Sequence, residues 1–128
     1  MKKRILATVL CLCLVMGVIG VPFAQAKWSN TSSIALDMSL SSGTITSKGT
    51  VVGKTGTSDI SVTYTLEKLV GGRYTHVDSW SASSSSMLSS KTNYTSNCTS
   101  GTYKLSISGT VTKDGYIEDI DDWFTKNL

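Results

Sequence analysis

The sequence is poor in the residues that most often carry chemistry. After residue 26, this chain of 128 residues has no proline, one cysteine (Cys98) and one histidine (His76). One cysteine excludes an intramolecular disulfide in that part of the chain. One histidine and one cysteine do not make up the ligand set of a zinc site. Nucleophile-elbow, phosphate-loop and dinucleotide motifs are also missing, so we expect a protein that is not an enzyme and has no cofactor.

A clustered positive charge is lacking as well. Of the twelve basic residues, Lys2, Lys3 and Arg4 stand at the N-terminus, which leaves nine against nine acidic residues from Lys27 onward. A nucleic-acid binder needs a basic surface that replaces phosphate counterions. An anionic membrane likewise selects a polybasic segment. The neutral main part of the chain therefore points away from both kinds of partner.

Residues 1–26 have the order of a secretory signal peptide. The basic start is followed by an apolar run from Ile5 to Val21, then by Pro22 and by Ala24-Gln25-Ala26, which has small residues where signal peptidase requires them. The alternative is a membrane anchor, but the apolar run is at the short end of a bilayer span. We expect cleavage after Ala26 and a secreted, extracellular domain over 27–128, with a signal that looks bacterial.

The remaining residues predict short strands. Ile60, Val62 and Tyr64 alternate with serine and threonine, and the same period of two recurs at 34–40 and 103–107. Such alternation puts one set of side chains in a core and the other in water. Gly71-Gly72 and Asp114-Gly115 are typical of tight hairpin turns.

Together these signals predict an all-β, antiparallel sandwich of about seven strands. Tyr64 and Trp80 are the expected central aromatics, and Gly109 suggests a bulge or bend. The serine-rich segment 81–86 is expected to be a flexible loop. The predicted strands cover 33–40, 45–52, 59–69, 73–80, 91–96, 102–112 and 116–121.

A resemblance supports this fold class. Gly101-Thr102-Tyr103-Lys104-Leu105 resembles the start of strand F in immunoglobulin-like domains, where the tyrosine hydroxyl bonds back to the preceding corner. Gly101 and Tyr103 would then have structural roles. Leu105 stands where antibody domains have their second cysteine, so the resemblance implies an immunoglobulin-like sandwich without the antibody-type disulfide.

The whole pattern also resembles a group of small secreted proteins of Gram-positive gut bacteria. The shared features are a signal peptide, a strand–Gly-Gly–strand hairpin that ends in tryptophan, and a late Gly-x-Tyr-x-Leu strand, here around Gly71, Trp80 and Tyr103. The group carries no assigned activity, so the resemblance implies a fold and an extracellular location only.

Candidate ligand-binding residues are the aromatics near the chain ends and at the Gly-Gly hairpin. Exposed aromatic rings can stack on sugars because one face of a sugar ring is apolar. The competing interpretation is that these rings close the ends of the core. The speculative ligand-binding set is Trp28, Arg73, Tyr74 and Trp123.

Two further clusters have weak functional interpretations. Glu118, Asp119, Asp121 and Asp122 offer oxygen ligands for calcium, although a solvated edge that discourages strand pairing explains them as well. His76 and Asp78, two apart on a strand, share a face in a regular strand, but nothing orients a nucleophile beside them. Cys98 is expected to be a small buried side chain, with an intermolecular disulfide as the alternative.

The expected function is non-catalytic extracellular binding or adhesion, with a cell-surface protein or a glycan as partner. A carbohydrate-binding module that uses exposed aromatics is one alternative. A secreted toxin or an enzyme of unknown mechanism is another.

Export should leave Lys27 as the first residue, because signal peptidase cuts after the second small residue of Ala24-Gln25-Ala26. N-terminal sequencing and the intact mass of the exported protein measure this. Ala26→Lys should retain the uncleaved form. Full-length protein in the medium, or a mature N-terminus far from Lys27, would contradict the assignment.

Overall fold

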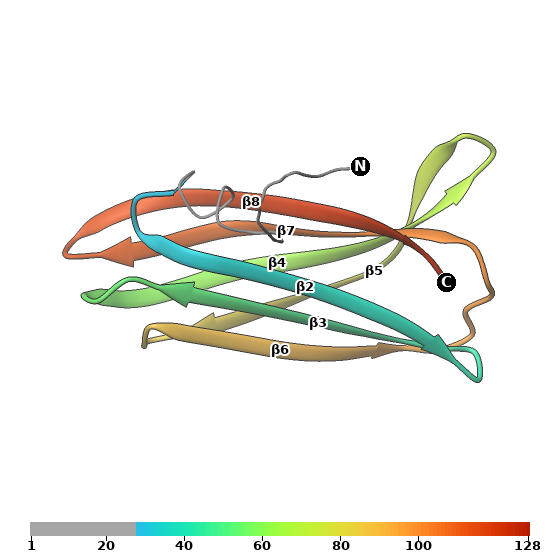
Figure 1. Cartoon of the computed structure of the whole chain (residues 1–128), viewed down its shortest axis with the longest axis horizontal. Coiled ribbons are helices and arrows are strands. Elements are labelled where there is room, and N and C mark those ends of the chain that lie inside the picture. Colours follow the sequence, from blue (N-terminus) through green and yellow to red (C-terminus); the bar gives the residue numbers. More distant parts are fainter. Residues whose placement is uncertain (1–27) are drawn as a thin grey trace, which may run out of the picture.

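The computed structural model describes residues 28–128, all in strands or short connections (Figure 1). The predicted signal peptide, with Ala24 and Ala26, lies outside the described residues. The predicted all-β class is confirmed. The seven strands are β2 (Thr31–Ser41), β3 (Thr44–Gly53), β4 (Thr57–Val70), β5 (Arg73–Ser84), β6 (Leu88–Thr95), β7 (Thr102–Lys113) and β8 (Tyr116–Asn127).

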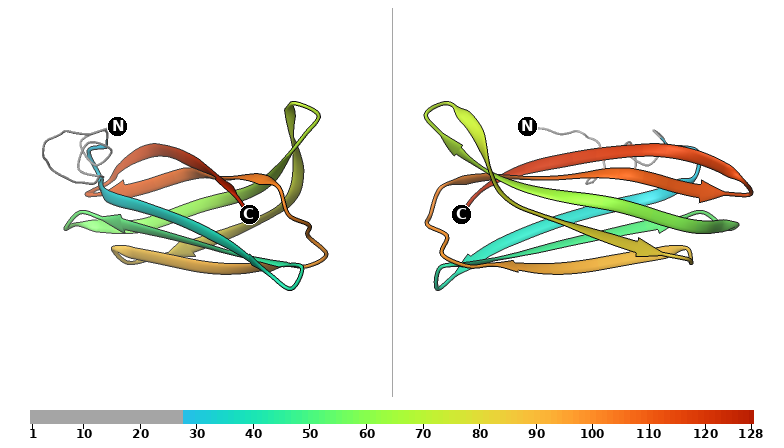
Figure 2. Two further views of the ribbon diagram at one scale, coloured as in Figure 1. Left: turned by 45° about the vertical axis from the view of Figure 1, so that its right-hand side comes forward. Right: turned by 180° about the vertical axis from the view of Figure 1, so that it is seen from behind.

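The strands form two antiparallel sheets that pack as a β-sandwich. One sheet has three strands in the order β2-β3-β6, and the other has four in the order β5-β4-β7-β8. The views in Figure 2 show the two layers face to face, with the β4–β5 hairpin projecting beyond the body of the sandwich. The described residues contain no helix that could cross a membrane.

The period of two in the sequence decides which side chains enter the core. On β4, Ile60, Val62, Tyr64 and Leu66 are buried, whereas the residues between them face outward. β7 buries Tyr103, Leu105 and Ile107 in the same way. Valine, isoleucine and aromatic side chains suit a strand whose one face is buried, and threonine suits the solvated face.

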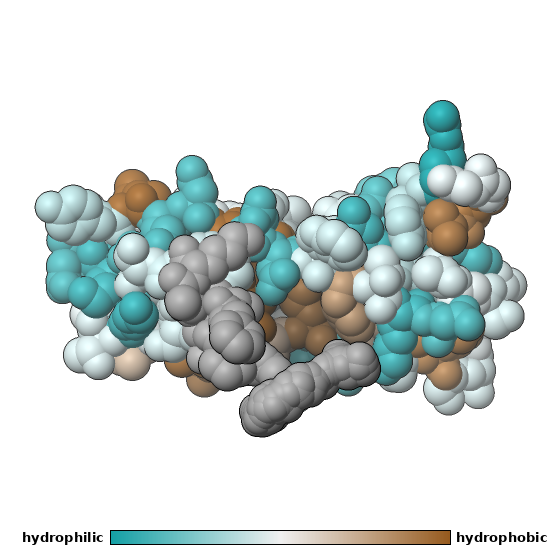
Figure 3. Space-filling view, turned by 45° about the horizontal axis from the view of Figure 1, so that its top comes forward, coloured by the Kyte–Doolittle hydropathy of each residue, from teal (hydrophilic) through white to brown (hydrophobic). Residues whose placement is uncertain are grey.

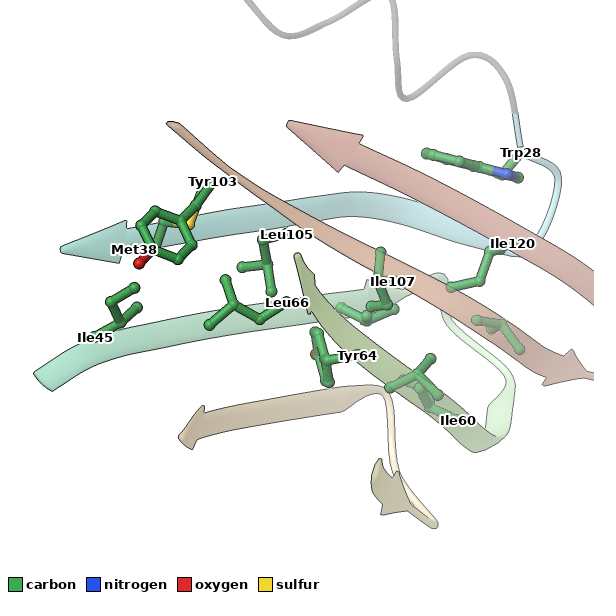
Figure 4. Packing of buried hydrophobic residues seen from close by; sticks show 13 residues of the cluster. Trp28, Met38, Ile45, Ile60, Tyr64, Leu66, Tyr103, Leu105, Ile107 and Ile120 are labelled. Atoms are coloured by element: carbon green, nitrogen blue, oxygen red, sulfur yellow. The ribbon is translucent and has the colours of Figure 1, made fainter. Parts of the chain in front are cut away.

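The core lies between the sheets, and Tyr64 is part of it (Figure 4). The ring of Tyr64 is fully buried and stacks on Trp80, with centroids 5.8 Å apart and planes 15° from parallel. Gly49 on the opposite sheet makes room for it, because a Cβ there would overlap the tyrosine ring. The predicted central aromatics are therefore present, with Tyr64 buried and Trp80 packed against it.

Two predicted hairpin turns are confirmed by their backbone angles. Gly71 and Gly72 have φ of 60° and 84°, and Asp114 and Gly115 have φ of 50° and 83°. Two successive positive φ values make the two-residue turn that matches the twist of paired strands. Glycine, aspartate and asparagine tolerate this conformation best.

Several local expectations differ from the structure. The predicted strand at 91–96 is β6, which begins at Leu88 and ends at Thr95. The segment 81–86 is not a loop throughout, because β5 continues to Ser84, with Ala82 packed against the core between outward serines. β8 runs to Asn127, beyond the predicted end at 121. Of the bulge or bend expected at Gly109, the bulge is absent, since the register of Gly109 with Val62 is regular. A side chain at Gly109 would collide with the Ser61 carbonyl, which explains the glycine.

Tyr103 makes the bond that its resemblance to the strand-F tyrosine implies. Its hydroxyl donates to the carbonyl oxygen of Thr99, four residues upstream, at 2.6 Å. The bond closes the corner that leads into β7. Nearby, Gly101 and Leu128 exchange two backbone hydrogen bonds of 2.9 and 2.7 Å, which hold the C-terminal residue beside the same corner.

The first described residues, 28–31, are also attached to the sandwich. Trp28 is buried beside Ile120 (Figure 4). The Asn30 side-chain amide donates to the carbonyl oxygens of Val111 and Tyr116, at 2.9 and 3.0 Å. Residues 28–31 are therefore part of the folded domain and close the end of the sandwich at the β7–β8 hairpin.

Removing the hydroxyl of Tyr103 and that of Tyr64 should affect stability differently. Tyr103→Phe leaves the Thr99 carbonyl without its donor, so the free energy of unfolding should fall by about 1 kcal/mol. The Tyr64 hydroxyl is buried without a hydrogen-bond partner among the described residues. Tyr64→Phe should therefore be neutral or stabilising. Urea unfolding measures both, and equal losses in the two variants would contradict the assignment.

Candidate functional site

The structure separates the four predicted ligand-binding residues. Trp28 is only 6% exposed and belongs to the core, so its expected role in ligand binding is wrong. Trp123 on β8 is 58% exposed. Arg73 and Tyr74 are neighbours at the start of β5, so strand alternation directs them to opposite faces. Of the predicted set, only Tyr74 and Trp123 come together.

Lys104 on β7 joins these two aromatic residues. Its ammonium nitrogen lies 4.7 Å from the centroid of the Trp123 ring and 5.5 Å from that of Tyr74. Both distances are within cation–π range. The cluster spans the four-stranded sheet, because its members come from β8, β7 and β5. We call Tyr74, Lys104 and Trp123 the aromatic–lysine cluster.

Short hydroxyl side chains occupy much of the same outward face. They occupy alternate positions on β4, β5 and β7, and register places Thr63 opposite both Ser81 and Ser108. None of them is buried. We call this surface the hydroxyl strip, and it consists of Ser61, Thr63, Thr65, Ser79, Ser81, Ser83, Ser106, Ser108, Thr110 and Thr112.

Many of these hydroxyls have no partner within the described chain. Thr63 and Ser81 approach each other at 3.4 Å, and Ser61 donates to Asp59 at 3.4 Å. A shallow open hollow of about 340 Å³ on this face is lined by Ser61, Val62, Thr63, Ser81, Ala82 and Ser83. Hydroxyls without a hydrogen bond to the described residues are those of Thr65, Ser83, Ser106, Ser108, Thr110 and Thr112.

The four C-terminal carboxylates do not converge. Alternation along β8 directs Glu118 and Asp122 toward the sandwich and Asp119 and Asp121 to the outward face. Within residues 28–128, no group of three possible metal-ligating side chains forms. The calcium interpretation of this cluster is therefore wrong for the described structure.

Glu118 instead holds the N-terminal segment. Its two carboxylate oxygens accept hydrogen bonds from the backbone N–H groups of Ser29 and Asn30, at 2.6 and 2.8 Å. Charge-assisted bonds of this kind are stronger than neutral ones. The acidic residue that the sequence presented as a metal ligand is a structural clamp between β8 and the chain start.

Asp78 on β5 joins the two sheets at the edge of the sandwich that lies away from β8. Its carboxylate accepts hydrogen bonds from Thr95 at 2.7 Å and Asn93 at 3.1 Å, both on β6. Burial opposes ionisation of Asp78. Hydrogen bonds from Thr95, Asn93 and the Ser79 N–H, together with the charge of nearby His76, outweigh burial and lower its pKa.

His76 does not join Asp78 in a catalytic arrangement. The register of β5 shifts at Val77, so His76 pairs with Glu67 on the outward face and Asp78 turns inward. The expectation that the two share a face was therefore wrong. His76 Nε2 lies 3.2 Å from the Ser79 hydroxyl, and both side chains are exposed. Since Asp78 is engaged across the sheets, no triad is assembled.

Cys98 is partly buried, and its thiol donates to the Thr95 carbonyl oxygen at 3.4 Å. It packs against the core, as the simpler interpretation of the sequence predicts.

The sequence interpretation missed Lys104 and the hydroxyl strip. The signal was present: serine and threonine recur with a period of two in three segments (61–65, 79–83 and 106–112), and Lys104 has the same parity as the third. Alternation shows that such residues share a face of one strand. Only strand order shows that the three segments are neighbours.

Comparison with known proteins adds no assignment. No protein-family model, curated protein or solved structure matches the chain.

Asp78→Asn should weaken the fold in a pH-dependent way. A carboxyl with a lowered folded-state pKa stabilises the protein above its ordinary pKa, 3.8, and this contribution disappears as pH falls through the folded-state pKa. We expect a loss of about 1 kcal/mol near pH 7, after allowing for solvent screening. The difference from wild type should shrink below pH 3.8.

Urea unfolding at a series of pH values measures this difference. Asp59→Asn, on the outward face of β4, controls for the loss of one negative charge. A difference that stays constant down to the acid limit of the fold would rule out the proposed role of the Asp78 carboxylate.

Proposed function

We propose that the chain is an exported, non-catalytic binding protein that works outside the cell. The order of residues 1–26, a basic start, an apolar run and Ala-Gln-Ala, supports export. The equal numbers of acidic and basic residues from Lys27 onward point away from nucleic acid and anionic membranes as partners.

The immunoglobulin-like character of the sandwich is part of this proposal. Two features support it. The strands β4, β7 and β8 lie side by side, in the positions of strands C, F and G of immunoglobulin-like domains. The Tyr103 hydroxyl bonds to Thr99 at the start of the strand that would be F. Domains of this architecture serve many unrelated binding roles, so the site has to be argued from its own residues.

The binding surface is the outward face of the β5-β4-β7-β8 sheet. The observation that carries this assignment is the aromatic–lysine cluster, where Trp123 and Tyr74 meet Lys104 on one exposed face. The other exposed large apolar side chains among the described residues are Leu69, Val70, Met87, Leu88, Tyr94, Tyr116 and Ile117, mostly in pairs at strand ends. Figure 3 shows separate brown patches among white and teal surface in this view. An aromatic cluster beside unpaired hydroxyls has the mixed character of a recognition surface.

The surroundings of the only histidine support a non-catalytic role. His76 and the Ser79 hydroxyl are exposed. The nearby carboxylate of Asp78 is bound by Thr95 and Asn93, so it does not orient the imidazole. A nucleophile needs a base that is itself oriented by a third group.

Bulkier side chains on the hydroxyl strip should block binding. The exported protein is sedimented with insoluble neutral polysaccharide, collagen, mucin or purified peptidoglycan, and the bound fraction is measured. Wild type should bind at least one of them. Ser106→Gln with Ser108→Gln should weaken that binding about tenfold, because the added side chains separate ligand and sheet.

The matched control places the same change on the other sheet. Ser39→Gln with Ser90→Gln alters the outward face of β2 and β6 and should leave binding unchanged. If this control variant lost binding while the Ser106/Ser108 variant kept it, the ligand would bind the β2-β3-β6 sheet, and the proposed binding surface would be wrong. Wild-type protein that binds none of the four materials would contradict the proposed function.

A further inference from the structure

The geometry of this face points to a neutral, linear glycan chain as its ligand, an inference that rests on the proposed function. Two sugar rings of the chain lie on Trp123 and Tyr74. Lys104 donates hydrogen bonds to the hydroxyls between them. Further sugars follow the hydroxyl strip along β7 and β4.

The spacing of the Trp123 and Tyr74 rings suits two sugars of one chain. The Lys104 ammonium nitrogen is 4.7 Å from one centroid and 5.5 Å from the other, so the two centroids are at most 10.2 Å apart. That limit is within the length of a disaccharide unit. Sugar rings have an apolar face of C–H groups that stacks on an aromatic ring, whereas their edges carry hydroxyls. Two adjacent platforms therefore fit successive rings of one chain.

Lys104 supplies polar contacts between the platforms. An ammonium group has three donors and no acceptor, and sugar hydroxyls and ring oxygens accept hydrogen bonds. Lys104 has no carboxylate at ion-pair distance among the described residues, so its donors are not committed to a salt bridge. The two rings hold its ammonium over the sheet by cation–π attraction, which reduces the entropy lost when a ligand binds.

The hydroxyl strip extends the surface beyond the aromatic platforms. Ser106 to Thr112 on β7 covers about 20 Å at the usual rise of a strand, which leaves room for several sugar units. Serine and threonine hydroxyls both donate and accept, as sugar hydroxyls do. The short side chains also leave the face low enough for a chain to lie on it.

Charge selects against acidic glycans. Asp59, Glu67 and Asp119 lie on the same outward face, against the single ammonium of Lys104. A chain of uronic or sialic acids would meet like charges along most of its length, and like-charge contacts are costly in an interface. An extended peptide is disfavoured for another reason: β4 and β7 are interior strands whose backbone groups are already paired, so no added strand can form there.

Native affinity electrophoresis of the exported protein tests the ligand class. The gels contain soluble neutral polysaccharides (hydroxyethyl cellulose, galactomannan or arabinoxylan) or, for comparison, polygalacturonate. At least one neutral polymer should retard the wild type, and polygalacturonate should not. Trp123→Ala and Tyr74→Ala should each raise the dissociation constant about tenfold through loss of a stacking platform. Trp123→Phe should keep part of the affinity.

Tyr94→Ala and Tyr116→Ala are the matched controls. Tyr94 is 68% and Tyr116 is 78% exposed, and neither belongs to the aromatic–lysine cluster, so both variants should bind as the wild type does. Lys104→Gln keeps a donor and should bind more tightly than Lys104→Ala. Titration with oligosaccharides of increasing length should show affinity rising beyond the disaccharide, because the strip adds contacts.

The outcomes separate this inference from the proposed function. Binding to collagen, mucin or peptidoglycan that depends on the Ser106/Ser108 face, without retardation by any neutral glycan, would overturn the ligand class and leave the binding surface in place. Retardation that survives Trp123→Ala and Tyr74→Ala but disappears in Tyr94→Ala would overturn both. Retardation by polygalacturonate stronger than by neutral polymers would overturn the charge argument.

Discussion

Alternation of side chains along an extended strand is the constraint on which the structure depends. Each of β4 and β7 buries one set of apolar residues against the other sheet, so the intervening residues must face solvent together. Register then brings the outward sets of neighbouring strands side by side. The core that stabilises the sandwich and the face proposed to bind ligand are thus two consequences of the same pattern.

Polar side chains join the two sheets at their edges, beside the apolar core. The two sheets meet through apolar packing, and both open sides of the sandwich are closed by hydrogen bonds. Asp78 reaches β6 on one side, and on the other the Lys126 ammonium donates to the Met38 carbonyl at 2.9 Å while Glu118 holds the chain start. Asp78 and Glu118, which the sequence offered as parts of a catalytic or metal-ligating set, are used in these structural contacts.

The prediction of the fold succeeded where local signals were sufficient. Gly71-Gly72 and Asp114-Gly115 determine turns through positive φ, and period-two runs determine strands. It failed where tertiary packing overrides composition. The serines after Trp80 read as a loop, yet Ala82 packs against the core and keeps the segment extended. The register shift at Val77 places His76 and Asp78 on opposite faces of the sheet, and no local sequence pattern predicts this shift.

The sequence alone was enough to predict the fold class and the turns and to give the balanced charge from Lys27 onward, because each follows from residue type and short-range spacing. Only the tertiary structure decided that Trp28 is buried while Trp123 is exposed, and that Lys104 lies between Trp123 and Tyr74. These residues are far apart in the chain. Their meeting depends on strand order and register, which arise from packing two sheets and not from any local segment.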